Sequence, residues 1–266
     1  MLLEIKDLNI EFHDHLIPET VVQDVSLTLE RGQIMGIVGE SGSGKTMTAL
    51  AIAGLLSRHD MKKTGEILFD GVNLLTCSRD ILRRYQGNDI SMIFQEPMTS
   101  LNPVKRIGWQ VEESLRLHTN LTKEERYSKT IQMLRDVELS DAEQVYRQYP
   151  HELSGGMRQR VMIASAMICD PQILIADEAT TALDVTIQAQ IVRLLFKLNK
   201  EKGTAILFIS HDLSLVRQLC SEVIVMQNGM IVEAGQTEAI YLTPKAPYTK
   251  QLIEAIPTCS KKISKV

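Results

Sequence analysis

The stretch Ile34–Leu50, IMGIVGESGSGKTMTAL, decides the fold of this chain. It begins with the apolar run Ile34–Val38, which is typical of a buried strand, and from Lys45 onward it contains no helix breaker. Between the two, Gly39–Thr46 reads GESGSGKT and matches G-x-x-x-x-G-K-[ST] in full. The pattern predicts a strand, a glycine-rich loop and a helix, in that order.

A loop of this kind is suited to the phosphates of a nucleoside triphosphate. Its glycines let successive backbone N–H groups turn inward as a nest for anions, and the following helix adds the positive end of its dipole. Lys45 is expected to reach the β- and γ-phosphates, and the Thr46 hydroxyl to bind Mg²⁺. We therefore predict nucleotide contacts from Gly39, Glu40, Ser41, Gly42, Ser43, Gly44, Lys45, Thr46 and Thr48. The alternative is a plain glycine-rich turn, which four specified residue types in this context disfavour.

Composition limits the class of protein. The 266 residues suffice for one large α/β domain, or for a core with a smaller inserted subdomain. A net charge of −4 disfavours nucleic acid as the main partner. Because charges come too early for a signal peptide and no apolar run approaches the roughly 18 residues of a membrane span, we expect a soluble protein that can still dock on a membrane protein. The cysteines contain no C-x-x-C pair and fit a reducing cytosol: Cys77, Cys169, Cys220 and Cys259.

Alternating apolar and polar residues at 2–12 and 21–29 predict an antiparallel pair of strands ahead of the loop. Phe12, or else His15, precedes the loop at a distance at which an aromatic ring could stack on a base. A Phe buried on the face of a small sheet is an equally good interpretation.

Beyond the loop helix the chain alternates strands and helices. Residues 64–71 predict a strand closed by an Asp-Gly turn, 79–84 a solvated helix, and 90–94 a buried strand that ends on Gln95. Two prolines bracket residues 97–103, which we interpret as a loop and a candidate hinge.

The segment that follows is helical. Its periodicity covers about 107–143, where Thr122 and Glu125 predict a capping box. A helix from Ser154 to about Ile168 opens with Ser154-Gly155-Gly156, whose N–H groups and dipole no bulky side chain covers. This start is a second possible anion site, although by itself it is only an N-cap with a flexible approach.

Two acids follow a buried strand. Ile173–Ala176 is apolar and ends in Asp177-Glu178, at the strand edge where ligands sit in nucleotide-binding α/β folds. We predict that Asp177 holds Mg²⁺, directly or through water, and that Glu178 polarises the attacking water. Two surface acids that merely close a strand are the alternative.

A histidine follows the next buried strand, 204–209, and is expected at the same sheet edge as Gln95 and Glu178. A lone His at a strand end is more often a core or cap residue, so the weight of His211 depends on its neighbours. Gly203 is predicted to end the preceding helix, Asn228-Gly229 to turn a hairpin, and residues 248–255 to form a short helix in the tail.

Together these residues resemble the ATP-binding subunits of ABC transporters over almost the whole chain. The family's motifs occur in the family's order: the Walker A loop Gly39–Thr46, the Q-loop Gln95, the LSGGM signature Leu153–Met157, the Walker B acids Asp177 and Glu178, the D-loop Thr181–Asp184 and the switch histidine His211. The resemblance implies an α/β fold with a P-loop NTPase (RecA-like) core, an antiparallel β subdomain and an inserted α-helical signature subdomain. It also implies boundaries, with the core at 1–94 and 170–235, the helical subdomain at about 95–169 and a short C-terminal extension at 236–266.

Three segments are similar to the peptide and nickel importer ATPases, namely 92–103, 180–186 and the tail with Pro247-Tyr248-Thr249. This resemblance implies an ATPase at the cytoplasmic face of a prokaryotic membrane, with peptides or nickel complexes as the cargo. Its implied partners are a second, non-identical ATPase subunit, two permeases and, indirectly, an extracytoplasmic binding protein. Ala179 stands where the family usually has proline, which we expect to loosen that turn slightly. The short tail, with Cys259 alone, predicts no iron-sulfur cluster.

The resemblance further implies that two subunits close head to tail. Ser154, Gly155 and Gly156 of one subunit then cap the γ-phosphate held by the loop of the other, with Asp184 nearby. The implied catalytic residues are Glu178, His211 and Lys45, and the implied Mg²⁺ ligands are Thr46, Gln95 and Asp177. The rival interpretations are a non-transport ABC ATPase of the repair or translation type and the ATPase of an exporter. Non-transport members usually carry coiled-coil insertions or two cassettes, which this sequence lacks.

Overall fold

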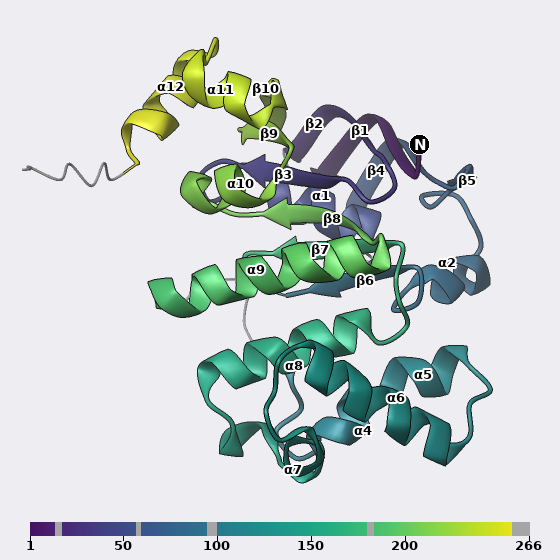
Figure 1. Ribbon diagram of the computed structural model, residues 1–266. Coiled ribbons are helices and arrows are strands. Elements are labelled where there is room, and N and C mark those ends of the chain that lie inside the picture. The colour runs from purple at the N-terminus through teal and green to yellow at the C-terminus, as the bar shows by residue number, and fades with distance from the viewer. Residues whose placement is uncertain (14–17, 57–59, 95–99, 180–183, 257–266) are drawn as a thin grey trace, which may run out of the picture.

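The computed structural model describes residues 1–13, 18–56, 60–94, 100–179 and 184–256, and Figure 1 shows their arrangement. In chain order, the strands are β1 (Leu3–Phe12), β2 (Glu19–Leu29), β3 (Ile34–Val38), β4 (Met61–Phe69), β5 (Val72–Asn73), β6 (Ile90–Ile93), β7 (Ile173–Asp177), β8 (Ala205–Ile209), β9 (Glu222–Gln227) and β10 (Met230–Gln236). The α-helices are α1 (Lys45–Ile52), α2 (Arg79–Tyr85), α4 (Ile107–Val111), α5 (Glu113–His118), α6 (Lys123–Asp136), α7 (Ala142–Arg147), α8 (Gly155–Met167), α9 (Val185–Lys202), α10 (Leu213–Leu219), α11 (Thr237–Leu242) and α12 (Pro247–Glu254).

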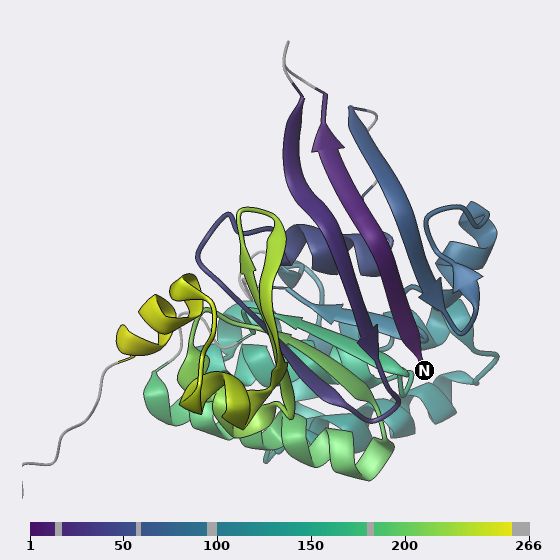
Figure 2. The same cartoon turned by 90° about the horizontal axis from the view of Figure 1, so that it is seen from above.

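The strands form two sheets. An antiparallel sheet has the order β2-β1-β4-β5, which confirms the predicted pairing of the first two strands. A second sheet has the order β10-β9-β3-β8-β7-β6 and is parallel except for β10. The predicted hairpin turn between β9 and β10 is confirmed, because Asn228 and Gly229 both have a positive φ, 49° and 80°. Figure 2 shows the long strands of the antiparallel sheet extending past the parallel one.

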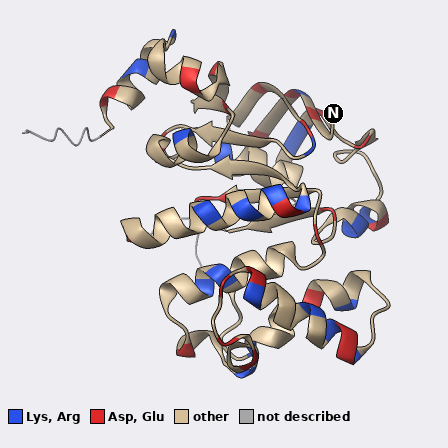
Figure 3. Cartoon of the chain, viewed as in Figure 1, with Lys and Arg blue, Asp and Glu red and all other residues tan. Residues whose placement is uncertain are grey.

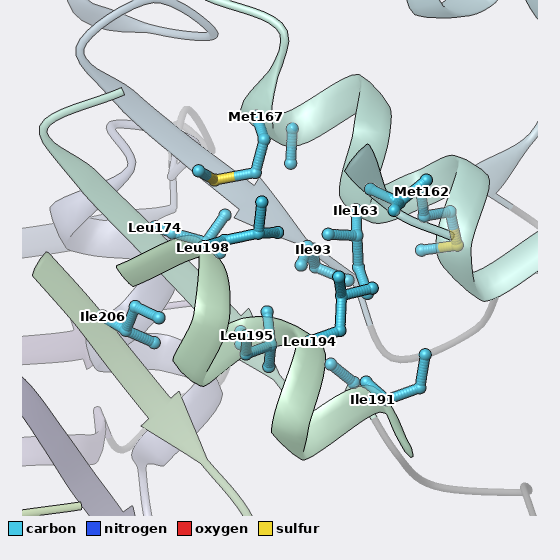
Figure 4. Packing of buried hydrophobic residues seen from close by; sticks show 14 of the residues in the cluster. Ile93, Met162, Ile163, Met167, Leu174, Ile191, Leu194, Leu195, Leu198 and Ile206 are labelled. Atoms are coloured by element: carbon cyan, nitrogen blue, oxygen red, sulfur yellow. The ribbon is translucent and has the colours of Figure 1, made fainter. Parts of the chain in front are cut away.

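Each central parallel strand contributes to two hydrophobic cores, because successive side chains point to opposite faces. In β7, Leu174 and Ala176 pack in the core beneath α8 and α9, whereas Ile173 and Ile175 pack toward the antiparallel sheet. Burial on both faces explains why such a strand is apolar at every position. Figure 4 shows the first core, where α8 and α9 close over the sheet with Ile163, Met167, Leu194, Leu195 and Leu198.

The helical segment after β6 is divided into α4, α5, α6 and α7 by local capping. The chain leaves α5 at Thr119, whose backbone is extended, and α6 starts at Thr122. The predicted capping box is confirmed, since the Thr122 hydroxyl accepts from the Glu125 amide while the Glu125 carboxylate accepts from the Thr122 amide. The Asp141 carboxylate then caps α7 by accepting a hydrogen bond from the backbone N–H of Gln144.

The parallel register aligns the ends of three strands. Ile209 of β8 lies opposite both Ile37 of β3 and Asp177 of β7. The carboxyl ends of these strands therefore meet at one edge of the sheet, where the phosphate loop, the two acids and His211 follow.

Figure 3 shows Lys and Arg positions interspersed with Asp and Glu positions along the ribbon. Among the described residues, no helix is both long and apolar enough to cross a bilayer.

Candidate nucleotide site

Glycine is required at both ends of the phosphate loop. Gly39 has φ 152°, and a Cβ there would lie 2.2 Å from the Met226 carbonyl oxygen. Gly44 has φ 96°, and its Cβ would lie 2.8 Å from the Val21 carbonyl oxygen. Both the backbone conformation and the available space exclude a side chain at these positions, which explains the spacing of the motif.

Lys45 begins α1 and turns back over the loop. Its Nζ donates to the carbonyl oxygens of Gly39 and Glu40, at 2.8 and 2.7 Å, and to Ser43 Oγ at 3.2 Å. The side chain is only 5% exposed. Burial lowers the pKa of the Lys45 ammonium, while the carboxylates of Glu178 and Asp177 oppose that shift. A buried cation that faces neutral carbonyls is well placed to exchange them for anionic phosphate oxygens.

The remaining loop residues divide by exposure. Glu40, Ser41, Gly42 and Thr46 are exposed to solvent, whereas Ser43 and Gly44 are buried. Thr48, which we expected to contact nucleotide, is fully buried, and its hydroxyl donates to the Gly44 carbonyl oxygen at 3.0 Å. Its side chain therefore fixes the end of the loop and offers no accessible surface to a ligand.

Asp177 is the last residue of β7 and lies beside the first turn of α1. Thr46 Oγ1 donates to Asp177 Oδ1 at 3.3 Å, so the structure brings together two of the three predicted metal ligands. The side chain is 3% exposed, and this burial raises the pKa of the Asp177 carboxyl, with the Thr46 hydrogen bond opposing the shift. Gln95, the third predicted ligand, lies outside the described residues, as does His15.

Glu178 occupies a strained backbone position next to His211. Its φ is +46°, an uncommon value for a residue with a side chain, and its N–H donates to the Ile209 carbonyl oxygen at 3.0 Å. Glu178 Oε1 lies 3.6 Å from His211 Nδ1. The expectation that the acid and the histidine share a sheet edge is confirmed. The following residue, Ala179, is 2% exposed and so packs into the core.

The signature residues lie on a different surface. Ser154 caps α8 by accepting from the Met157 amide at 3.3 Å, as the sequence predicts. Ser154 and Gly155 are exposed, and a Cβ at Gly155 would meet no atom within 4 Å. Gly156 is closed by Ile187, 3.3 Å from its Cβ position. The described residues thus leave one face of this helix start open.

Asp184 is connected to the start of α8 through Ile187. Its carboxylate caps α9 by accepting from the Ile187 amide at 2.9 Å. Ile187 therefore contacts both Asp184 and the signature residue Gly156.

Phe12 ends β1, opposite Glu19 and Met61, and its ring is partly buried. Val21, from the neighbouring strand, lies against the loop at Gly44, so this end of the antiparallel sheet reaches the site. Contact between Phe12 and a base stays a prediction.

A glycine-rich loop between a parallel strand and a helix, with a buried lysine and an aspartate from the adjacent strand, defines a P-loop nucleotide-binding protein. Comparison with known proteins narrows the class. Residues 22–181 match the ABC transporter family model. The chain belongs to the ABC transporter family, whose ATPases bind ATP and hydrolyse it in step with transport.

Individual relatives are similar over nearly the whole chain. The "Probable peptide ABC transporter ATP-binding protein y4tR" of Sinorhizobium fredii is 46% identical over 97% of this chain and 77% of its own length. The "Oligopeptide transport ATP-binding protein OppD" of Escherichia coli is 46% identical over 96% of this chain and 76% of its own. A solved structure of the ATP-binding cassette MJ0796, described as a dimeric post-hydrolysis state bound to ADP and Pi, matches with a TM-score of 0.79 and 27% identity over 89% of this chain and 99% of that one.

Proposed function

We propose that this protein is the ATP-hydrolysing subunit of an ABC importer that takes up peptides through partner permeases. The observation that carries the proposal is the convergence of Lys45, Asp177 and Glu178 at one sheet edge, in a chain whose relatives are named for peptide, dipeptide, oligopeptide and glutathione transport. Those names favour peptides over nickel complexes as the cargo.

The phosphate loop supplies binding. Backbone N–H groups of the loop and the start of α1 face the triphosphate, and Lys45 exchanges the carbonyl oxygens of Gly39 and Glu40 for phosphate oxygens. Because the ammonium is buried, its attraction for the phosphoryl charge that develops during hydrolysis is stronger than it would be in water.

The residues present fit a magnesium ion that accompanies the nucleotide. Thr46 and Asp177 offer a hydroxyl and a buried carboxylate 3.3 Å apart, and Gln95 is predicted to join them. Within the part of the chain that the structure describes, no three His, Cys, Asp or Glu side chains form a metal cluster, which suits an ion held by one carboxylate together with phosphate oxygens. When bound, Mg²⁺ supplies positive charge to the β- and γ-phosphate oxygens.

Glu178 and His211 act on water. The carboxylate of Glu178 is the proton acceptor that orients a water molecule for in-line attack on the γ-phosphate, and His211, 3.6 Å away, positions the same reacting groups. The hydrogen bond from the Glu178 amide to the Ile209 carbonyl holds the acid at its strained backbone angle, so its direction is set before nucleotide arrives.

In this proposal the exposed start of α8 contacts the nucleotide that is bound to a second subunit. Ser154 and Gly155 are exposed, and a Cβ at Gly155 would meet no atom of the described residues within 4 Å, as expected of a helix start that closes on nucleotide bound elsewhere. The second ATPase is a non-identical paralogue in this proposal, and the dimeric state of the MJ0796 cassette supports pairing of this kind.

A groove beside β6 is suited to a permease. It has a volume of about 300 Å³ and runs between the core and the helical segment, with Leu55, Met92, Phe94 and Met162 among its lining residues. Phe94 is 42% exposed, which is high for an aromatic side chain at the junction of two packed regions. We assign the groove to a short amphipathic helix on the cytoplasmic side of a permease. In this proposal the chain lies at the cytoplasmic face of the membrane. The permease then connects it indirectly to an extracytoplasmic binding protein. In this proposal the helical segment of about 95–169 is a subdomain that moves against the core, and 236–266 is an extension.

Glu178→Gln tests the catalytic assignment. The amide keeps the size of the side chain but cannot accept the proton, so ATP binding should persist while turnover by the assembled complex falls at least about 100-fold. Glu201→Gln, an exposed change near the end of α9, should leave both unchanged. Near-normal hydrolysis by Glu178→Gln would refute the assignment.

The cargo is tested by uptake in cells that lack this chain and are complemented with it. Labelled peptide should enter only in the complemented cells, and the Glu178→Gln variant should not restore entry. Restored uptake of radiolabelled nickel without peptide uptake would refute the peptide assignment.

A further inference from the structure

A tyrosine of the C-terminal extension contacts the phosphate loop. Tyr248, in α12, is 8% exposed, and its hydroxyl oxygen accepts a hydrogen bond from the backbone N–H of Glu40 at 2.9 Å. The two residues are 208 positions apart in the chain. The hydrolysis mechanism above makes no use of Tyr248.

Glu40, the residue that Tyr248 contacts, also accepts hydrogen bonds from within the phosphate loop. The carbonyl oxygen of Glu40 accepts from Lys45 Nζ at 2.7 Å and from the Ser43 backbone N–H at 3.2 Å. The amide and the carbonyl of Glu40 are thus both bonded, one to the extension and the other to the phosphate-binding lysine. A shift of Glu40 would move the carbonyl oxygen that accepts from Lys45. It would also change the turn that sets the direction of the following N–H groups in the loop.

The extension is itself bonded to β10 and α10, so it can hold Tyr248 in position. The Glu233 carboxylate of β10 accepts from the backbone N–H groups of Lys245 and Ala246, at 2.8 and 3.0 Å, immediately before α12. Arg217 of α10 forms two hydrogen bonds with Glu238 of α11, at 3.0 and 2.8 Å. Figure 1 shows α11 and α12 lying beside β9 and β10, and β9 pairs with β3, the strand that leads into the loop.

We propose that Tyr248 is a positioning residue of the nucleotide site and that, through Glu40, the C-terminal extension holds the phosphate loop in the shape that receives a nucleoside triphosphate. The inference rests on the proposed function and adds a determinant of nucleotide affinity that lies outside the Walker A, Q-loop, signature, Walker B, D-loop and switch-histidine motifs. The hydroxyl acts on the loop and touches no reacting atom. Its loss therefore weakens binding more than it slows the chemical step.

Tyr248→Phe tests the inference, because it removes the hydroxyl and keeps the buried ring. One neutral hydrogen bond corresponds to a two- to tenfold change in a binding constant. We expect the Kd for ATP, measured by calorimetry without Mg²⁺, to rise by that factor, and the KM for ATP to rise with a smaller change in kcat.

Tyr241→Phe is the matched control. It makes the same change in the same extension, where the Tyr241 hydroxyl donates to the Leu213 carbonyl oxygen of α10 and not to the loop. Its Kd for ATP should equal that of the wild type even where its Tm falls. An unchanged Kd in Tyr248→Phe, or an equal rise in both variants, would overturn the inference. A wild-type chain that fails to bind ATP would refute the proposed function, and this inference with it.

Discussion

Replacing Gly155 with aspartate should separate the stability of the chain from the action of its site. Gly155 is the first residue of α8, after the Ser154 cap, and a Cβ there would meet no atom within 4 Å. Its φ is not positive, so a side chain introduces no backbone strain. No described residue of the chain would clash with the new side chain, so we expect any loss of activity in Gly155→Asp to arise from what approaches this helix start in the assembled complex.

The two effects have opposite signs. A carboxylate in the first turn of a helix stabilises it through the dipole, and replacing glycine removes conformational entropy from the unfolded chain, together about 0.5–1.5 kcal/mol in the free energy of unfolding. For a chain of this size the Tm should rise by about 1–5 °C. In a closed site, two unit charges about 4 Å apart at an effective dielectric constant near 20 repel by about 4 kcal/mol, which is about a thousandfold in rate.

The assays follow from that separation. Thermal unfolding and ATP binding are measured on the isolated chain, and ATP hydrolysis on the complex assembled with the second ATPase and the permeases. We expect a higher Tm, unchanged ATP binding and almost no hydrolysis, while Gly155→Ala, which adds volume without charge, retains most of the activity. Hydrolysis by Gly155→Asp within about tenfold of the wild type would refute the reasoning, as would loss of ATP binding by the isolated chain.

Two further predictions concern the helical segment. Gly108→Ala should lower the free energy of unfolding by about 1–3 kcal/mol in a denaturant titration, because the added Cβ would lie 2.2–2.5 Å from the Tyr146 ring. Gly235→Ala is the control and should cost far less, because its Cβ meets its nearest neighbour at 3.7 Å. Equal costs for the two variants would contradict the overpacking argument. Burial, together with the hydrogen bond to Glu112, raises the pKa of Tyr146 to about 12 from an ordinary value of 10.0, so its contribution to stability is present below about pH 10 and lost as the pH rises to about 12. Tyr146→Phe should flatten that alkaline loss relative to the wild type in thermal unfolding scans, and parallel pH profiles would show that another group is responsible.

Local signals in the sequence were enough to predict the loop and the strand ends at which the candidate site lies. The apolar run of β3 and the glycine spacing of the loop depend on neighbours within a few residues, and the structure reproduces both with α1 beginning at Lys45. The acids after β7 were also predictable, since a buried parallel strand has only one edge at which it can present charge to a ligand. The pairing of Glu178 with His211 follows from strand order together with register.

Other features were missed although a signal was present. Helix α10 is capped by Asp212, whose carboxylate accepts from the Ser214 amide at 2.8 Å, and its buried face repeats at Leu213, Val216 and Leu219. The cap and this spacing of three are the ordinary marks of a short amphipathic helix.

The role of Tyr248 could not have been derived from the sequence. Its tripeptide marks the resemblance to peptide importer ATPases, but nothing local indicates a bond to a loop 208 residues earlier. That contact depends on the docking of α11 and α12 against β10 and α10, and such tertiary packing has no periodic signature. Prediction from sequence therefore reaches the candidate nucleotide-binding groups and does not reach the tertiary contacts made to them.

The packing of α8 against α9 connects the signature residues to the core beneath the candidate nucleotide site. Ile187 closes over Gly156 at the signature and donates its N–H to the Asp184 cap, while Arg160 of α8 donates to Gln190 of α9 at 3.2 Å. Side chains of α9 also pack in the same core as Leu174 and Ala176 of β7, the strand that ends at Asp177. Because close-packed interiors transmit displacements, a shift of the signature residues should reach Asp177 and Glu178 through this core. Under the proposed function, in which α8 closes on nucleotide bound to a second subunit, this packing would connect that closure to the chain's own candidate site.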